Sequence, residues 1–148
     1  MADLKGFSTR LIEIGVSVAE GGDRVVRKAA LACDQAVVIA TPVDTGRARS
    51  NWLASVDAPR TDVVEPAVPG KKGSTGESNT QASMAAAAGV IAGYAGGSNR
   101  EIHIANNLPY IEELNRGSSR QAPANYVQDG VAAAVGAIQG ARVLSSDD

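Results

Sequence analysis

The stretch Thr41-Pro42-Val43-Asp44-Thr45-Gly46-Arg47 separates a long helical pattern from a short extended one in this 148-residue chain. The helical pattern must end at Thr41, because a residue that precedes proline is disfavoured in the α region. Asp44 can bond the backbone ahead of it and Gly46 can supply a left-handed dihedral, so the sequence predicts a tight turn there. Two interpretations stay open for this turn: a plain connector and a contact surface.

The segment before the turn, from about Phe7 to Ala40, is predicted to be one long amphipathic helix. Its apolar positions recur every seven residues at Leu11, Val18, Val25 and Ala32. Gly15 and the Gly21-Gly22 pair each cost about 1 kcal/mol against alanine inside a helix. The pattern therefore allows a break near Gly22, with Asp23 capping the second part.

The segment after the turn alternates from Ala48 to Val56, which predicts a strand with Trp52 facing inward and Asn51 on the other face. Arg47 and Arg49 would then project from the start of this strand. Their planar guanidinium groups suit carboxylates.

A long polar segment follows from Asp57 to Thr80, and it contains three prolines and three glycines. It offers little apolar surface to bury, so we expect a flexible loop or arm over 57–80. Structureless loops of this length are usually functional or disordered. The basic tip at Lys71 and Lys72 is either a solubilising feature or a contact for an acidic partner or a nucleic-acid backbone.

The C-terminal half predicts a helix from Gln81 to about Ala92, capped by Ser78-Asn79-Thr80. Glu101 to Ala105 alternates as a second strand, with Ile102 and Ile104 inward and His103 outward. A short helical turn should follow Pro109.

The last helix is expected from Tyr126 to about Ala141, with Asn125 as its cap. We take residues 1–144 as a single domain and residues 145–148 as a disordered tail. Before the last helix, Asn106-Asn107-Leu108-Pro109-Tyr110 stops the second strand and redirects the chain. Core packing and an interface are both open for Tyr110, whose hydroxyl needs a partner when buried.

The composition excludes several classes of function. The net charge is −2 and the isoelectric point is near 5.4, so there is no basic footprint of a nucleic-acid-binding protein. The single cysteine, Cys33, allows neither an intrachain disulfide nor a cysteine-based zinc site. Without a long apolar run or a signal-peptide pattern, we expect a soluble protein made in a cytoplasm, with no membrane partner.

Catalytic groups are sparse as well. His103 is the only histidine, and Glu101 two residues away on the same strand face predicts an ion pair. Glu112 and Glu113 diverge by about 100° on a helix, so they cannot share a substrate. Gly70 to Gly76 lacks the spacing of a phosphate-binding loop. We therefore predict no catalytic, cofactor-binding or metal site and no enzymatic activity.

Taken in order, these segments resemble the tail-completion and minor-tail-protein families of long-tailed bacteriophages, the group that includes the protein Z type. The resemblance covers essentially the whole chain. The residues that carry it are Thr41 to Arg47 with Asp44, Thr45 and Gly46, then Asn51-Trp52, Asn106 and Asn107 with Pro109 and Tyr110, Glu113-Leu114, and Gly117 with Ser119, Gln121, Ala122 and Pro123. One departure is Leu114-Asn115, where the family often has Leu-Glu.

The resemblance implies an α+β fold in which a long N-terminal helix and further helices pack on a small antiparallel sheet. It also implies a structural virion protein that completes the tail or joins it to the head, as a ring of commonly six copies around the DNA channel. Its partners would be neighbouring connector, terminator or tail-tube proteins, and DNA would pass without sequence-specific binding. It would sit in the tail or neck of the virion, after assembly in the host cytoplasm. On this view the 57–80 arm reaches a neighbouring subunit or the next ring.

Three alternatives remain. A tail-terminator ring would share the architecture. A remote possibility is a hydrolase built around Asp44-Thr45-Gly46 that acts as a dimer. The third is a DNA-binding packaging accessory, against which the acidic isoelectric point argues.

Overall fold

The computed structural model describes residues 4–96 and 100–140 of the chain. The elements in order are α1 (Leu4–Ala40), α2 (Arg47–Ser50), β1 (Leu53–Val56), α3 (Gly76–Ala92), β2 (Ile102–Ala105), α4 (Ile111–Asn115) and α5 (Tyr126–Gln139). The predicted α+β class is confirmed: a long N-terminal helix and further helices accompany a two-stranded antiparallel sheet. Residues 145–148, expected to be a disordered tail, lie outside the described part.

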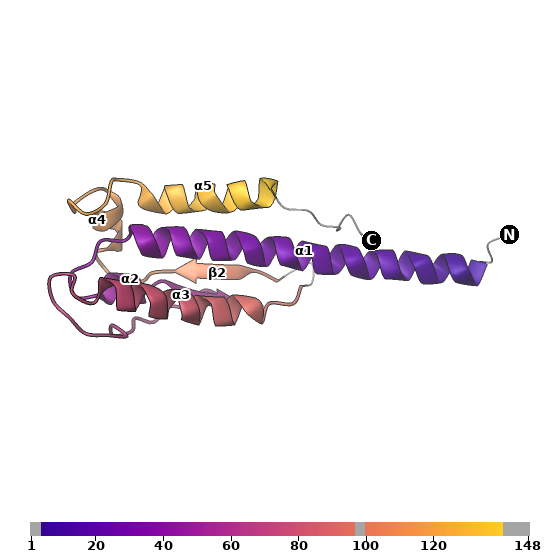
Figure 1. The fold of residues 1–148 in the computed structure, drawn as a ribbon, viewed down its shortest axis with the longest axis horizontal. Coiled ribbons are helices and arrows are strands. Elements are labelled where there is room, and N and C mark those ends of the chain that lie inside the picture. The colour runs from indigo at the N-terminus through magenta and orange to yellow at the C-terminus, as the bar shows by residue number, and fades with distance from the viewer. Residues whose placement is uncertain (1–3, 97–99, 141–148) are drawn as a thin grey trace.

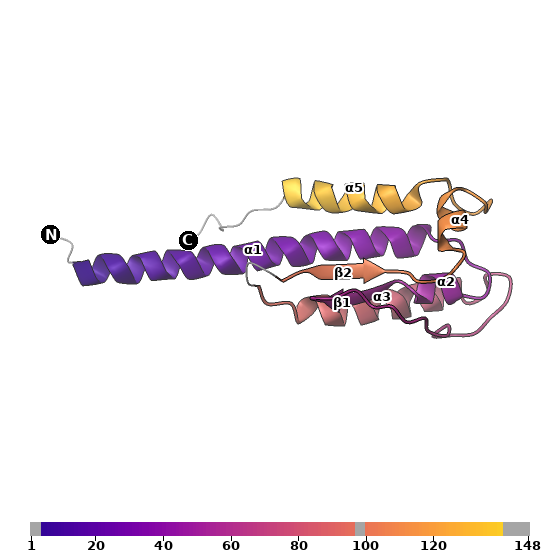
Figure 2. The same ribbon diagram turned by 180° about the vertical axis from the view of Figure 1, so that it is seen from behind.

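The two-stranded sheet packs against α3 and α1 (Figures 1 and 2). β1 and β2 pair from Leu53 opposite Ala105 to Val56 opposite Ile102. α3 and α1 also contact each other, because Ala30 and Leu31 of α1 pack against the cluster that contains Ala87 and Ile91 of α3. α5 runs antiparallel to α1. α1 is therefore the central helix, with α5 on one side and α3 and the sheet on the other.

α1 is one unbroken helix of 37 residues, so the expected break near Gly22 is wrong. Glycines weaken a helix but remove none of its backbone hydrogen bonds, whereas proline does. No proline occurs before Pro42, and the helix continues to the residue before Thr41.

The predicted strand over Ala48 to Val56 is wrong in its first half. Arg47–Ser50 forms the helical turn α2, closed by a bond from the Ser50 N–H to the Gly46 carbonyl at 3.1 Å. Trp52 is buried as predicted, although it lies just before β1. Its indole N–H donates to the Thr41 hydroxyl at 2.8 Å, which ties the end of α1 to the start of the sheet.

The prediction for the second strand is confirmed. Ile102 and Ile104 pack against the two core clusters. His103 faces away, and its Nε2 lies 3.2 Å from the Glu101 carboxylate.

The core is small and divided. One cluster joins Val37 and Val38 of α1 to Trp52, Ala122 and Tyr126, and the other joins Ala54 to Ala87 and Ile91 of α3. Asp34 is fully buried on α1, which the composition gave no reason to expect. The core is built mainly from small and medium side chains, as the shortage of aromatic residues predicts.

Two helix starts differ from their predictions. α3 begins at Gly76, so the residues expected to form its cap lie inside its first turns. Asn125 does precede α5, but it adopts a left-handed conformation without a side-chain capping bond. The cap comes from Asn115 of α4, whose Oδ1 accepts the Val127 N–H at 2.9 Å.

Candidate functional site

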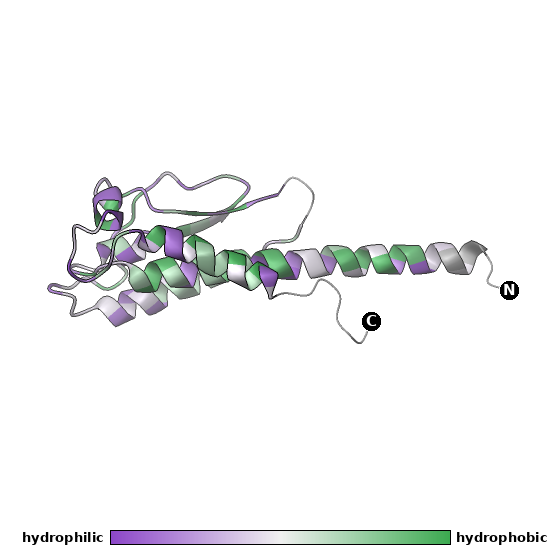
Figure 3. Ribbon diagram, turned by 90° about the horizontal axis from the view of Figure 1, so that it is seen from above, coloured by the Kyte–Doolittle hydropathy of each residue, from purple (hydrophilic) through white to green (hydrophobic). Residues whose placement is uncertain are grey.

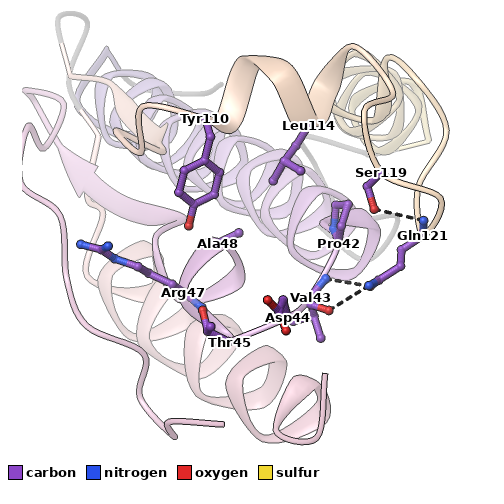
Figure 4. A pocket seen from close by; sticks show the side chains of 10 residues that line it. All are labelled: Pro42, Val43, Asp44, Thr45, Arg47, Ala48, Tyr110, Leu114, Ser119 and Gln121. Carbon is purple, nitrogen blue, oxygen red and sulfur yellow. Dashed lines mark hydrogen bonds between the residues drawn. The ribbon is translucent and has the colours of Figure 1, made fainter. Parts of the chain in front are cut away.

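The two motif stretches meet at one end of the molecule, around an open pocket of about 310 Å³ (Figure 4). One wall is the turn after α1 with the start of α2, and the other is α4 with the loop that follows it. The lining residues are Pro42, Val43, Asp44, Thr45, Arg47, Ala48, Tyr110, Leu114, Ser119 and Gln121. Five of them lie within the Thr41 to Arg47 stretch that the sequence singled out.

Gln121 joins the two walls. Its Oε1 accepts the Val43 N–H at 2.8 Å and its Nε2 donates to the Val43 carbonyl at 2.9 Å. The Gln121 N–H in turn donates to the Ser119 hydroxyl at 3.1 Å. The Gln121 side-chain amide therefore bonds both backbone groups of Val43, as a neighbouring strand would. It holds together two segments that are 78 residues apart in the sequence.

Asp44 is a backbone acceptor within the turn. Its Oδ1 accepts the Lys72 N–H at 2.9 Å, and its carbonyl accepts the Gly73 N–H at 2.8 Å. Gly46 has a φ of 85°, and a Cβ there would lie 2.1 Å from Asn79 Nδ2. These bonds hold the turn in place. Position 46 requires glycine, because its φ is left-handed and because a side chain there would collide with Asn79.

Arg47 and Tyr110 are two polar side chains of the pocket that keep capacity for a ligand. Tyr110 is 39% exposed, and Figure 4 shows its hydroxyl pointing into the pocket, towards Arg47. The guanidinium lies 3.8 Å from the exposed Glu65 carboxylate, and its buried Nε has no hydrogen-bond partner. A planar donor beside a phenol suits a carboxylate or backbone carbonyl of another protein chain.

Arg49 does not present its guanidinium to a carboxylate, contrary to the prediction. It donates to the carbonyls of Thr41 at 2.8 Å and Ile39 at 3.2 Å, and to the Thr80 hydroxyl at 2.8 Å. Burial lowers the pKa of Arg49. A cation at the C-terminal end of α1 satisfies carbonyls that the helix leaves open and complements its dipole.

Side-chain amides hold the irregular segment 57–75 against the body. Asn51 bonds both the N–H and the carbonyl of Val64, each at 2.8 Å. Asn79 does the same for Val68, at 2.9 and 2.7 Å. Asn107 donates to the Arg60 carbonyl at 2.9 Å. The segment predicted as an arm over 57–80 therefore has its last five residues in α3 and much of its backbone bound to its own molecule.

Asn106, in the second motif stretch, also bonds backbone groups through its side-chain amide. Its Nδ2 donates to the Ala48 carbonyl at 3.0 Å, and its Oδ1 accepts the Leu108 N–H at 3.2 Å. Asn79 and Asn115 were not chosen from the sequence as key residues. The signal that could have found them is the excess of amide side chains next to segments without regular structure.

The remaining sequence-predicted residues do not line the pocket. The side chains of Lys71, Lys72 and Pro123 are exposed, Pro109 is exposed at the start of α4, and Trp52 is buried in the core. Glu113 pairs with Arg116 at 2.9 Å. Gly117 has a φ of 90°, which fits its place in the loop after α4.

The side chains that line the pocket limit the chemistry it can perform. Its lining contains no histidine, cysteine or lysine. Within residues 4–96 and 100–140, no group of three or more histidine, cysteine or acidic side chains is placed to hold a metal ion. No described helix is long and apolar enough to cross a membrane.

Comparison of the chain with models of protein families, with curated proteins and with solved structures finds no match. The relation to phage tail-completion proteins therefore rests on the ordered motifs, and the role that it implies is a proposal.

Proposed function

We propose that this chain is a structural protein of a long-tailed phage particle, which completes the tail or joins it to the head without catalytic turnover. The observation that carries the proposal is the pocket at the end of α1, where both motif stretches converge (Figure 4). Most of their polar side chains are bonded to backbone of the same molecule, as expected for residues that set a shape. Arg47 and Tyr110 remain to bind a neighbour.

Copies of the chain would assemble as a ring around the DNA channel, commonly of six, with connector, terminator or tail-tube proteins as neighbours. The acidic net charge is consistent with a channel wall that lets DNA pass rather than binding it. The hydrogen bonds that hold residues 57–75 in place favour a contact through a fixed outer surface of this segment over a freely reaching arm.

The test is deletion of the gene in its native phage or prophage, followed by negative-stain electron microscopy of the particles. DNA-filled heads separate from tails of finished length would support the proposal, and overlong tails would favour the tail-terminator role. Intact infectious virions would contradict both.

Complementation then tests the pocket. Wild-type protein should restore infectious particles, and Tyr110→Ser should restore far fewer, because it removes a half-exposed aromatic contact at the site. Arg120→Ala is the matched control, since Arg120 is exposed nearby but does not line the pocket. Equal rescue by all three proteins would show that the pocket is not the contact site.

A further inference from the structure

The N-terminal half of α1 stands clear of the rest of the molecule (Figures 1 and 2). The body reaches α1 at Asp23, whose carboxylate accepts the Gly96 N–H at 2.9 Å. Ahead of that point large aliphatic side chains are exposed: Leu11 53%, Ile12 68%, Ile14 54% and Val18 46%. Figure 3 shows hydrophobic residues along this projecting part. Single exposed aliphatic residues are ordinary, but a group of them on one helix marks an interaction surface.

Two of these side chains, Leu11 and Val18, belong to a seam with a period of seven. Leu11, Val18 and Val25 occupy one seam position, and the residue four places after each is small. Those small residues are Gly15, Gly22 and Ala29. The opposite face carries Arg10, Glu13, Ser17 and Glu20. This is the pattern of a helix that pairs with another helix at close range.

The C-terminal part of the seam already has such a partner. α5 packs antiparallel to α1 there, so closely that a Cβ on Gly130 would lie 2.4 Å from a Val37 methyl group. Near the end of α5, Ile138 and Val26 line the same groove. Ahead of Val26 the seam continues, yet a Cβ on Gly15 or Gly22 would have no described atom within 4 Å.

Nothing in the described part of the monomer requires glycine at positions 15 and 22. Glycine weakens a helix relative to alanine, and neither position has a positive φ or a close neighbour that would require it. A second helix that approaches the backbone at these two positions would explain them. The seam therefore favours a partner whose large side chains fall opposite Gly15 and Gly22.

We propose that the partner is a second copy of this chain, and that residues 7–26 of two copies pair antiparallel about a two-fold axis between Val16 and Ser17. In that register Leu11 of each copy faces Gly22 of the other, and Val18 faces Gly15. The surface is self-complementary, as a two-fold interface requires. It repeats the antiparallel mode of α1 and α5.

This pairing does not depend on the proposed role in the phage particle. The projecting half of α1 and the motif pocket lie at opposite ends of the molecule (Figure 1). The two-fold contact describes the free protein, whereas a ring would need contacts of another symmetry.

The first test is the mass of the full chain in solution, by light scattering after gel filtration at micromolar concentrations. The wild type should be a dimer, and Gly15→Leu with Gly22→Leu should be a monomer of equal or higher helix content. Both added side chains have room in the monomer, and leucine is the better helix former. Gly89→Leu on α3 is the matched control, because its position is equally open but distant from the seam. A monomeric wild type, a dimeric double variant or a ring-sized species would each overturn the proposal.

The second test fixes the orientation by disulfide formation in a Cys33→Ser background. A mixture of Leu11→Cys and Gly22→Cys proteins should form the mixed disulfide under mild oxidation. Leu11→Cys alone should not, because the antiparallel register places its two copies about 16 Å apart, far beyond the Cα separation of roughly 4.4–6.8 Å that a disulfide allows. A Leu11→Cys homodimer would show parallel pairing and overturn the register.

Discussion

At the scale of single residues, Asp34 is the least expected feature of the molecule. It is fully buried on α1, and neither carboxylate oxygen has a hydrogen-bond partner among the described residues. Burial raises the pKa of Asp34 to about 7. A charged form is costly in this position, so the folded protein holds the proton that the unfolded chain releases near its ordinary pKa.

The raised pKa of Asp34 has a defined effect on stability. Below about pH 4 the group is neutral in both states. As the pH rises to about 7 the unfolded chain loses the proton first, so the free energy of unfolding falls across this window. The Asp34→Asn variant should not show that fall. At pH 8 its free energy of unfolding should exceed that of the wild type by up to about 4 kcal/mol. Urea unfolding from pH 4 to 8 measures it, with the exposed Asp129→Asn as control. Parallel profiles for wild type and Asp34→Asn would contradict the prediction.

Gly46 is the residue on which the turn depends. Alanine there would take a left-handed dihedral and displace the Asn79 amide, which lies 2.1 Å from the Cβ position. We expect Gly46→Ala to lower the free energy of unfolding by about 2 kcal/mol or more. Gly89→Ala, in open space within α3, should raise it by about 1 kcal/mol. Urea unfolding of both variants checks the contrast, and equal effects would mean that the turn relaxes freely.

At the scale of elements, the segment 57–75 takes its order from side chains outside it. Asn79 bonds both backbone groups of Val68 and also accepts the Ser50 hydroxyl at 2.9 Å. Asn79→Ala should leave these groups unsatisfied, at about 1–3 kcal/mol. We expect the Val68 amide to exchange with deuterium at least tenfold faster, with the exposed Gln81→Ala as control. An unchanged rate would show that the segment is held by other contacts.

The elements show which signals in the sequence are dependable. The α+β class, α1 and the register of inward residues on β2 follow from periodicity, because they bury continuous apolar faces. The strand predicted over Ala48 to Val56 fails in its first half because tertiary bonds of Arg49 to the end of α1 stabilise a helical turn. Alternation within a few residues carries no information about such distant partners.

The candidate site was predictable in part for the same reason. Turn chemistry indicated Asp44 and Gly46 from local sequence, and both proved to be fixed in the turn. Local sequence did not indicate the pairing of Gln121 with Val43 or the capping of α5 by Asn115. Both depend on how the chain folds back on itself. Amide side chains bond any exposed backbone group, so their partners appear only in three dimensions.

At the scale of the whole molecule, the divided core and the projecting helix point to a protein that gains stability by association. Most helical stability in proteins comes from tertiary packing of an amphipathic face, so the free half of α1 has little support of its own. Fully burying an aliphatic side chain contributes about 1.5–3 kcal/mol, so each half-exposed residue of the seam has about 1 kcal/mol left to gain.

Thermal unfolding should report self-association of the free protein. Binding to the folded state alone raises stability with the concentration of the binding partner. The Tm of the wild type should therefore rise by several degrees between about 1 and 100 μM protein. The Tm of Gly15→Leu with Gly22→Leu should be independent of concentration, since its added side chains fill the space that the second copy needs. Circular dichroism melts over this range measure both, and a wild-type Tm that does not change with concentration would count against self-association of the free protein.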